Sequence, residues 1–222
     1  MYNMDISKIK HTYYINLKER PDRKDQVIQE LQNIGINNPE RIDAIKCSFG
    51  AVGCSLSHLK CLEMAKSRNL EHVLIVEDDI TFLNPQLFIT QFNKFLNNCK
   101  EWDVVVLSGN NIGEHTVVED SYVKIHNCQC ATGYFVKNTY FDKLIENFQT
   151  GINQFIKYPS EGKYFALDMY WKRLQVTDNW FLITPLTVVQ REGYSNIEKR
   201  HTNYIKMMLD LDKPYLYRQN KL

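Results

Sequence analysis

An acidic triplet, Glu77-Asp78-Asp79, directly follows the apolar residues 73–76. Four consecutive aliphatic residues, three of them β-branched, predict a strand that is buried on both faces of a sheet. Three adjacent carboxylates would repel one another in a core, but a divalent cation can neutralise them at the open edge of a sheet. In open α/β sheets, ligands bind just beyond the carboxyl ends of the strands. The segment therefore predicts an α/β sheet with a ligand site at residues 77–79.

Within the triplet, Glu77 and Asp79 are two residues apart, so on an extended backbone their side chains point to the same side. We expect this pair to hold one metal ion, leaving Asp78 for a ligand hydroxyl or a structural hydrogen bond. The alternative is a solvated acidic turn that closes the strand. We favour a site, because the position at a strand end and the spacing agree.

The composition suits one globular domain, with 222 residues of which 44% are hydrophobic. The net charge of +1 gives no global field that would favour nucleic acid or a membrane. No apolar stretch approaches the roughly 20 residues that span a bilayer, and the N-terminus lacks the apolar region of a signal peptide. The six cysteines form no C-x-x-C pair and are expected to be reduced thiols, with Cys54 and Cys61 as small core residues. We therefore expect a soluble, cytoplasmic protein without a transmembrane segment.

Strand-like and helix-like segments alternate over the first ~110 residues, which predicts a mostly parallel sheet with right-handed crossovers. The expected strands in this half are 11–17, 41–45, 73–76 and 104–107, and the expected helices are 21–34, 56–65 and 88–96. The second half is expected to contain strands 122–125, 130–136, 180–183 and 186–189, helices 140–148 and 167–174, and a mobile lid-like loop at 150–163. We expect one domain with two unequal halves, about 1–110 and about 111–222.

Four cationic side chains crowd the start of the first predicted helix: Lys18, Arg20, Arg23 and Lys24. A helix N-terminus already favours anions, so this crowding indicates an anionic ligand such as a nucleotide diphosphate. The alternative is internal pairing with Glu19 and Asp22. The residues alone leave both interpretations open.

Gly50 and Gly53 predict a loop that leads into a helix and allows a ligand to approach the backbone closely, with Ser57 and His58 in the first helical turn. The spacing matches neither G-x-G-x-x-G nor a P-loop. A lone histidine at such a place is more often structural, so the residues alone favour that role for His58. An exposed position is likewise favoured for His201, with a distal metal ligand as the alternative.

Asp168 begins a predicted helix beside Met169-Tyr170-Trp171. An aspartate at this place can cap the helix, or it can act as a general base at the mouth of the sheet. The neighbouring aromatic residues would suit a sugar ring. The residues alone favour the cap.

Taken together, five segments resemble glycosyltransferase family 25, the family of bacterial lipopolysaccharide galactosyltransferases and procollagen galactosyltransferases. The segments are YYINLKERPDRK (13–24), GAVGCSLSHLKCLEMA (50–65), VLIVEDDITF (73–82), ALDMYWKRLQ (166–175) and VVQREGYSNIE (188–198). They run in the order of the family and extend over most of the chain. The chain resembles the short, single-domain members.

This resemblance implies a GT-A fold: a nucleotide-sugar-binding half (about 1–110) joined to a smaller, mixed acceptor-binding half (about 111–222). It implies a UDP-sugar donor, Mn²⁺ (or Mg²⁺) at Glu77 and Asp79, and inversion at the anomeric carbon. The residues that it places at the nucleotide or its pocket wall are Asn16, Arg20, Arg23, Ser57, His58 and Asp78. It also makes Asp168 the best candidate for the catalytic base, above the cap. One departure is Asn196, where the family commonly has aspartate.

We therefore expect a metal-dependent transfer of galactose or glucose from a UDP-sugar to a glycan, a lipid-linked sugar or a collagen-like protein. The alternative is a catalytically degenerate GT-A domain that binds nucleotide or glycan as a partner protein, which the Asn196 departure keeps open. A nucleotidyltransferase ranks lower because no glycine-rich loop follows the first strand. A haloacid-type phosphatase ranks lower still because Glu77 stands at the nucleophile position. The oligomeric state is open, with a homodimer as one option.

Overall fold

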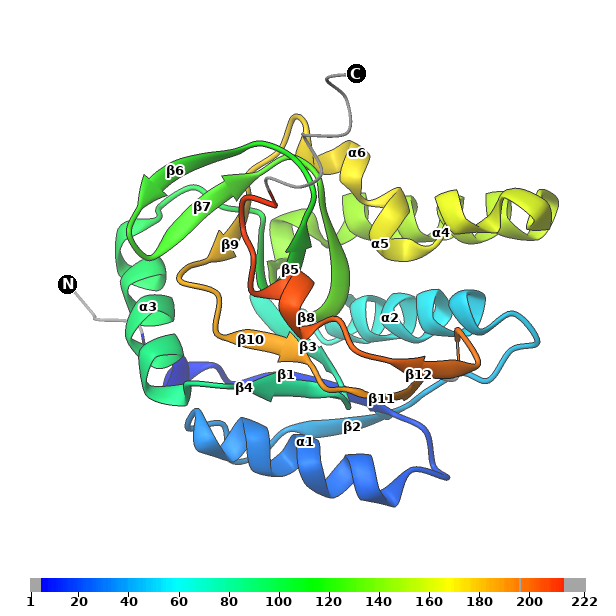
Figure 1. The fold of residues 1–222 in the computed structure, drawn as a ribbon, viewed down its shortest axis with the longest axis horizontal. Coiled ribbons are helices and arrows are strands. Elements are labelled where there is room, and N and C mark those ends of the chain that lie inside the picture. The colour runs from blue at the N-terminus through cyan, green and yellow to red at the C-terminus, as the bar shows by residue number, and fades with distance from the viewer. Residues whose placement is uncertain (1–4, 196, 214–222) are drawn as a thin grey trace.

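An eight-stranded sheet lies at the centre of the structure (Figure 1), a computed structural model that describes residues 5–195 and 197–213. Its strand order is β2-β1-β3-β8-β5-β9-β7-β6. The strands are β1 (Thr12–Asn16), β2 (Glu40–Asp43), β3 (His72–Glu77), β5 (Val104–Asn111), β6 (His115–Glu119), β7 (Tyr122–Ile125), β8 (Cys128–Lys137) and β9 (Trp180–Ile183). Only β7 and β8 run against the other strands of this sheet. The expected α/β class, with a largely parallel sheet, is confirmed.

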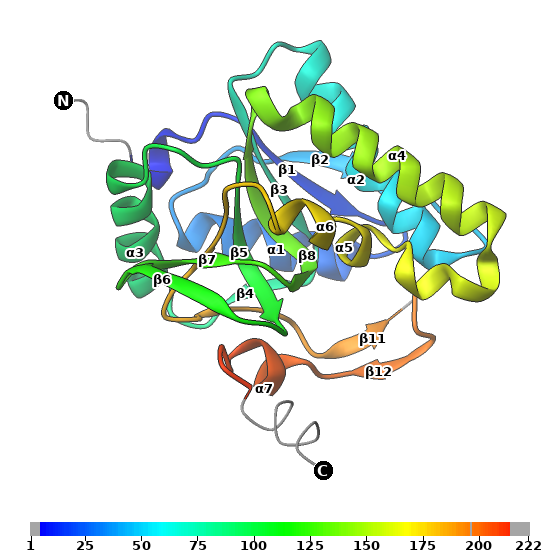
Figure 2. The ribbon, with the colours of Figure 1, turned by 90° about the horizontal axis from the view of Figure 1, so that it is seen from above.

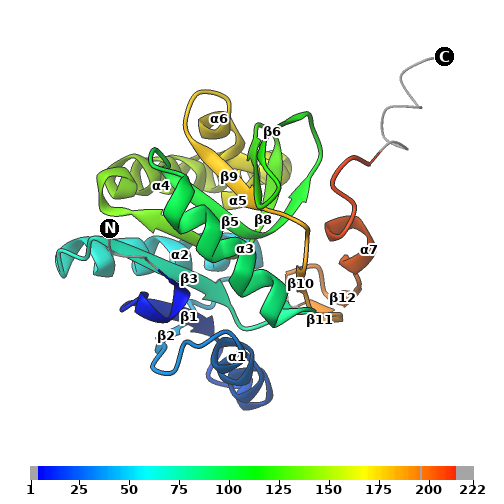
Figure 3. The same cartoon turned by 90° about the vertical axis from the view of Figure 1, so that its left-hand side faces the viewer.

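Helices cover both faces of the sheet (Figures 2 and 3). One face packs against α1 (Pro21–Asn33) and α3 (Pro85–Asn98), and the other packs against α2 (Gly50–Ser67) and α4 (Phe141–Lys157). Along β3, Val73 and Ile75 belong to the hydrophobic core on the side of α2 and α4, while Leu74 and Val76 belong to the core on the side of α1 and α3. Because successive residues of a strand point to opposite faces, an unbroken apolar run is what a doubly covered strand requires.

Smaller elements bring the C-terminal segment back to the end of β3. The strand β10 (Val188–Gln190) pairs with β4 (Ile80–Phe82), and β11 (Gly193–Ser195) pairs with β12 (Arg200–Thr202). The other helices within residues 5–195 and 197–213 are α5 (Leu167–Tyr170), α6 (Lys172–Gln175), α7 (Ile205–Met208) and three short 3₁₀ turns at Ile6–Lys8, Asn138–Tyr140 and Pro159–Tyr164. Among the residues described, no helix has both the length and the apolar character to cross a membrane.

The predicted loop at Gly50 and Gly53 is wrong, because both glycines belong to the first turns of α2. A Cβ atom at Gly53 would stand 2.4 Å from the carbonyl oxygen of Ile45. At Gly50, it would stand 3.0 Å from the Cα atom of Ile197. These glycines therefore let other segments of the chain lie close to α2, whereas the sequence predicted that a ligand would approach there.

The predicted lid-like loop at 150–163 is also wrong. Residues up to Lys157 continue α4, and a 3₁₀ turn follows at Pro159. Ile152 and Phe155 extend the buried face of α4, and this packing outweighs the helix-weakening glycine at 151. A Cβ atom on Gly151 would lie 3.0 Å from the carbonyl oxygen of Phe165, so the helix lies directly against that segment.

Candidate active site

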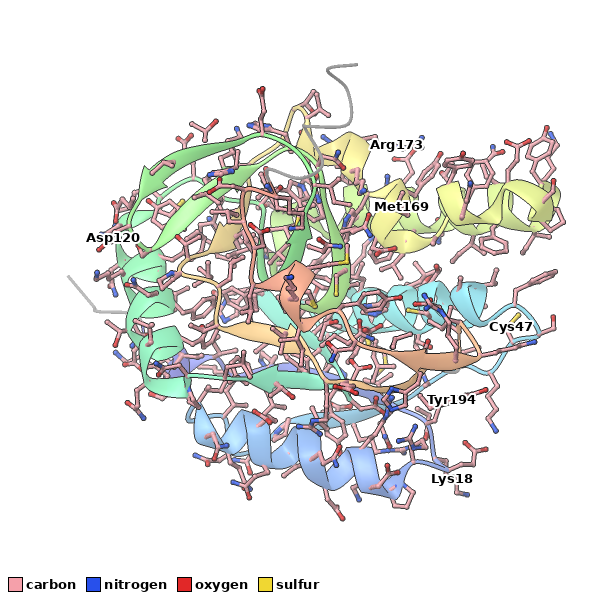
Figure 4. The ribbon with its side chains drawn as sticks, in the orientation of Figure 1. Lys18, Cys47, Asp120, Met169, Arg173 and Tyr194 are labelled. Atoms are coloured by element: carbon pink, nitrogen blue, oxygen red, sulfur yellow. The ribbon has the colours of Figure 1, made fainter. Side chains whose placement is uncertain are left out.

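A cavity of about 560 Å³ lies at the carboxyl ends of β1 and β3. Its walls come from the β1–α1 connection, the loop before α2, the acidic triplet and the C-terminal segment. Cys47 and Tyr194, labelled in Figure 4, mark the loop before α2 and strand β11. The cavity residues that matter below are Arg20, Arg23, Ser57, Glu77, Asp78, Asp79 and Gln190. The site predicted at the end of the third strand is thus next to the predicted cationic segment.

Arg23 connects two members of the acidic triplet to β11. Its Nη1 donates to Asp78 Oδ1 at 3.0 Å and to Asp79 Oδ2 at 3.1 Å, and its Nη2 donates to the carbonyl oxygen of Tyr194 at 3.1 Å. Arg20 instead pairs with Asp22, with 2.7 Å between Nη2 and Oδ2. Both arginines border the cavity, so internal pairing and an anionic ligand are compatible here.

Asp79 is the least compensated carboxylate of the triplet. Burial, followed by the nearby charge of Glu77, raises its pKa from 3.8 to about 7. Gln190 Nε2 donates to Oδ2 at 3.2 Å, while Oδ1 is buried and has no hydrogen-bond partner in the described structure. A buried carboxylate oxygen without a hydrogen-bond partner, in a segment with two further carboxylates, fits a divalent cation with oxygen ligands. Burial raises the pKa of Asp78 too, despite its bonds from Asn16 and Arg23.

Glu77 is held from behind by α2. Its Oε1 lies 3.3 Å from His58 Nε2 and accepts from Cys54 Sγ at 3.3 Å. Burial acts to raise the pKa of Glu77, but the hydrogen bond and charge of His58, with help from Cys54 and Arg23, leave it below the usual 4.5. Burial and the charge of Glu77 raise the pKa of the Cys54 thiol well above its usual value.

Three residues predicted to lie at the nucleotide or on its pocket wall have hydrogen-bond partners within the protein. Asn16 is 2% exposed; its Nδ2 donates to Asp78 Oδ2 at 2.7 Å, and its Oδ1 accepts from Arg41 Nε at 3.0 Å. Ser57 borders the cavity, but its hydroxyl donates to the Gly53 carbonyl oxygen at 2.7 Å. His58 is fully buried. Asn16 and His58 thus position carboxylates of the triplet and do not themselves border the cavity.

A second cavity, of about 310 Å³, adjoins the first and contains Asp168. The two cavities share Cys54, Glu77, Gln190, Ser195 and Ile197. The carboxylate of Asp168 makes no cap on its own helix; its Oδ2 accepts from the backbone N–H of Cys130 at 2.9 Å. The cap interpretation is therefore wrong. Burial, followed by the charge of Glu77, raises the pKa of Asp168.

Other sequence interpretations fare differently. His201 is exposed, 3.7 Å from Glu192, and borders neither cavity. Asn196 lies outside the described residues.

Sequence analysis missed Gln190, which stands in the last quoted motif, and it took Cys54 for a core residue. The pairing of β10 with β4 brings Gln190 to Asp79, and no local pattern encodes that contact.

A family model described as "Glycosyltransferase family 25 (LPS biosynthesis protein)" matches residues 46–157. This range contains the acidic triplet, Ser57 and His58, while Asn16, Arg20, Arg23 and Asp168 lie outside it. The chain is also similar to a curated Acanthamoeba polyphaga mimivirus protein named "Procollagen lysyl hydroxylase and glycosyltransferase", with 23% identity over 93% of this chain. A "Glycosyltransferase 25 family member" of Aedes aegypti is 23% identical over 64% of this chain.

The matched region spans only 28% and 29% of these two relatives. Among solved structures, the chain is similar to a glycosyltransferase involved in glycosylation of the major capsid of PBCV-1. That likeness has a TM-score of 0.49 and 10% identity, and it covers 85% of this chain and 95% of the other.

Proposed function

Because this chain belongs to glycosyltransferase family 25, we propose that it transfers galactose or glucose from a UDP-sugar to a hydroxyl group of a glycan or protein, with inversion and with Mn²⁺ or Mg²⁺. The observation that supports this most directly is the pair of adjoining cavities that meet at Glu77. The larger has arginines and clustered carboxylates, as a nucleotide diphosphate with a cation requires. The smaller has Asp168, as an acceptor hydroxyl requires.

On the donor side, Glu77 and Asp79 would hold the cation, and Arg20 and Arg23 would face the diphosphate. A divalent cation at this place supplies electrostatic stabilisation of the charge that develops on the leaving group. The arginines add charge-assisted hydrogen bonds to phosphate oxygens. Asn16 and His58 keep Asp78 and Glu77 in position for this role.

On the acceptor side, Asp168 accepts the proton of the attacking hydroxyl. The oxygen of that hydroxyl forms a bond to the anomeric carbon as the bond from this carbon to the diphosphate breaks, on the opposite face. The upward shift in the pKa of Asp168 brings it closer to the operating range of a general base. The bond from Cys130 leaves its carboxylate in a fixed orientation.

Thermal unfolding with UDP, in the presence and absence of Mn²⁺, tests the donor side. At 100 times its dissociation constant, a ligand stabilises the folded state by about 2.7 kcal/mol. We expect a metal-dependent shift in the wild type and in the control Asp120→Asn, an exposed aspartate that pairs with Lys94. We expect no shift in Asp79→Asn. A wild-type protein that shows no shift with UDP and Mn²⁺ would overturn the donor assignment.

A panel of UDP-sugars, followed by release of UDP, then tests turnover and the sugar. Candidate acceptors are glycans, lipid-linked sugars and collagen-like peptides, the last because the mimivirus relative is named for procollagen. Metal-dependent UDP binding without turnover on any of them would favour the alternative of a nucleotide-binding partner protein.

A further inference from the structure

Three side chains with different donor atoms converge at the boundary of the two cavities. Cys54 and His58 lie one helical turn apart on α2, and Glu77 ends β3. Cys54 Sγ and His58 Nε2 each lie 3.3 Å from Glu77 Oε1, and the three donor atoms all lie within 4.8 Å of one another. Within residues 5–195 and 197–213, this is the one group of three or more such side chains close enough to share an ion.

We propose that Cys54, His58 and Glu77 form a Zn²⁺ site. Tetrahedral zinc, with bonds of about 2.0–2.3 Å to nitrogen, oxygen and sulfur, places its ligands roughly 3.5 Å apart. The two separations of 3.3 Å are close to this value, and the third, between Cys54 Sγ and His58 Nε2, is within 4.8 Å, so the three ligands can reach one ion through side-chain movements. Sulfur and imidazole ligands select zinc, whereas Mn²⁺ and Mg²⁺ prefer oxygen ligands. The ligand chemistry therefore differs from that of the oxygen-only pair Glu77 and Asp79.

The surroundings of His58 match those of a metal-bound histidine. Its Nδ1 lies 3.1 Å from Tyr134 Oη, and the two rings stack with centroids 5.6 Å apart. Both side chains are fully buried, so the imidazole is fixed with Nε2 toward Glu77. With zinc on Nε2, Nδ1 carries the proton and donates to Tyr134 Oη. A hydrogen bond of this kind fixes the tautomer of the histidine and supports metal binding.

The site is also accessible, because Cys54 and Glu77 border both cavities. A water molecule can take the fourth position from that side, as in zinc sites with three protein ligands. On binding, the sulfur–hydrogen bond of Cys54 breaks, the thiolate bonds to Zn²⁺, and the proton leaves to cavity water.

Co²⁺, which absorbs visibly when bound by thiolate, is the probe for this site. The full chain is first stripped with a chelator and then titrated with Co²⁺. We expect a thiolate-to-cobalt charge-transfer band that saturates at one equivalent and disappears when Zn²⁺ is added. Cys54→Ser should lose the band, while Cys47→Ser, which alters an exposed free cysteine of the adjoining loop, should keep it. Tyr134→Phe should weaken Zn²⁺ binding roughly 10- to 100-fold, as loss of an outer hydrogen bond usually does.

A wild-type protein without the band, or a Cys54→Ser variant that folds and keeps it, would overturn the proposal. If Cys54→Ser does not fold, His58→Gln tests the second ligand and should bind Zn²⁺ much more weakly than the wild type. Asp79→Asn should keep the band, since Asp79 is not a ligand here. The readout needs neither UDP nor a sugar acceptor, so it can be scored whether or not the protein shows the proposed transferase activity, although both proposed sites include Glu77.

Discussion

Cys130 donates its backbone N–H to Oδ2 of Asp168 at 2.9 Å, across a sequence separation of 38 residues. Cys130 has a φ of 82°, an uncommon conformation for a residue other than glycine. The bond connects the irregular part of β8 to α5 and keeps the Asp168 carboxylate at the wall of the smaller cavity. A strained backbone that orients a carboxylate is typical of functional sites.

Asp168→Asn is therefore expected to slow transfer strongly while preserving the fold. The amide oxygen can still accept the bond from Cys130, but it cannot take a proton from an acceptor. Loss of a general base typically costs a factor of about 10²–10⁴ in rate. The measurement is the rate of sugar transfer beside metal-dependent UDP binding, with Asp142→Asn as a control that removes an exposed carboxylate. Unchanged transfer in Asp168→Asn would place the base elsewhere.

Arg23→Gln should destabilise the protein and make it depend more strongly on divalent cations. The change removes the cation that Asp78 and Asp79 share and the bond to Tyr194. A lost hydrogen bond to a charged group costs about 1.5–3 kcal/mol. Chemical unfolding with and without Mn²⁺ should show that Mn²⁺ raises the free energy of unfolding more in the variant than in the wild type. Arg200→Gln, which breaks an exposed pair with Glu198, should change little. An equal gain from Mn²⁺ in all three proteins would argue against cation binding at the triplet.

Gly53→Ala should destabilise the fold through a steric clash. The new Cβ atom would lie 2.4 Å from the Ile45 carbonyl oxygen, so α2 or the preceding loop must shift. Overpacking of this kind typically costs about 1–3 kcal/mol. The comparison is Gly193→Ala, in which the new Cβ atom would lie 3.7 Å from its nearest neighbour, Arg23 Nη2. Similar unfolding midpoints for the two variants would contradict the close contact at Gly53.

Asp178→Asn should lower stability at neutral pH but not in strong acid. Asp178 Oδ1 accepts from Lys143 Nζ at 2.8 Å, and Tyr140 donates to its other oxygen. Burial acts to raise the pKa of Asp178, but these hydrogen bonds outweigh that effect, so the pKa lies below the usual 3.8. A depressed carboxylate pKa contributes stability above the unfolded pKa, and this contribution is lost as the pH falls through the folded pKa.

The difference in unfolding free energy between the wild type and Asp178→Asn should accordingly be about 1–3 kcal/mol at neutral pH. It should shrink as the pH falls below 3.8. Urea unfolding at several pH values measures this, with Asp142→Asn as the control. A difference that stays constant across the range would show that the side chain acts through packing instead of charge.

Much of the sheet could be predicted from the sequence because its strands have unambiguous local patterns. The apolar runs at 73–76 and 104–107 each lie within a central strand, and Pro21 begins a helix where its missing N–H does no harm. Glycine misled the prediction at Gly50 and Gly53, because its role there is close packing against another segment of the chain. A contact between segments that are far apart in the sequence cannot be recognised in the local spacing of apolar residues. The division into a donor half and an acceptor half stays a prediction.

For the site, the acidic triplet and the two arginines could be predicted to share a sheet edge, since both segments follow parallel strands. The partners of the triplet could not. Gln190 reaches Asp79 only through the pairing of β10 with β4. The resemblance places His58 on the pocket wall, but in the structure it faces Glu77 and Tyr134, as the structural role favoured by the residues alone would have it.

The last strand of the central sheet along the chain, β9, ends at Ile183, yet part of both cavity walls comes from residues 190–208. The sheet is thus complete in sequence before the residues that close one side of both cavities. Once β9 has been synthesised, every strand of the central sheet is present. The residues that complete the enclosure around the triplet follow later in the chain. A fragment that ends with β9 would have all the strands of the central sheet but would lack β10, β11, β12 and α7, and with them one side of the enclosure around the triplet.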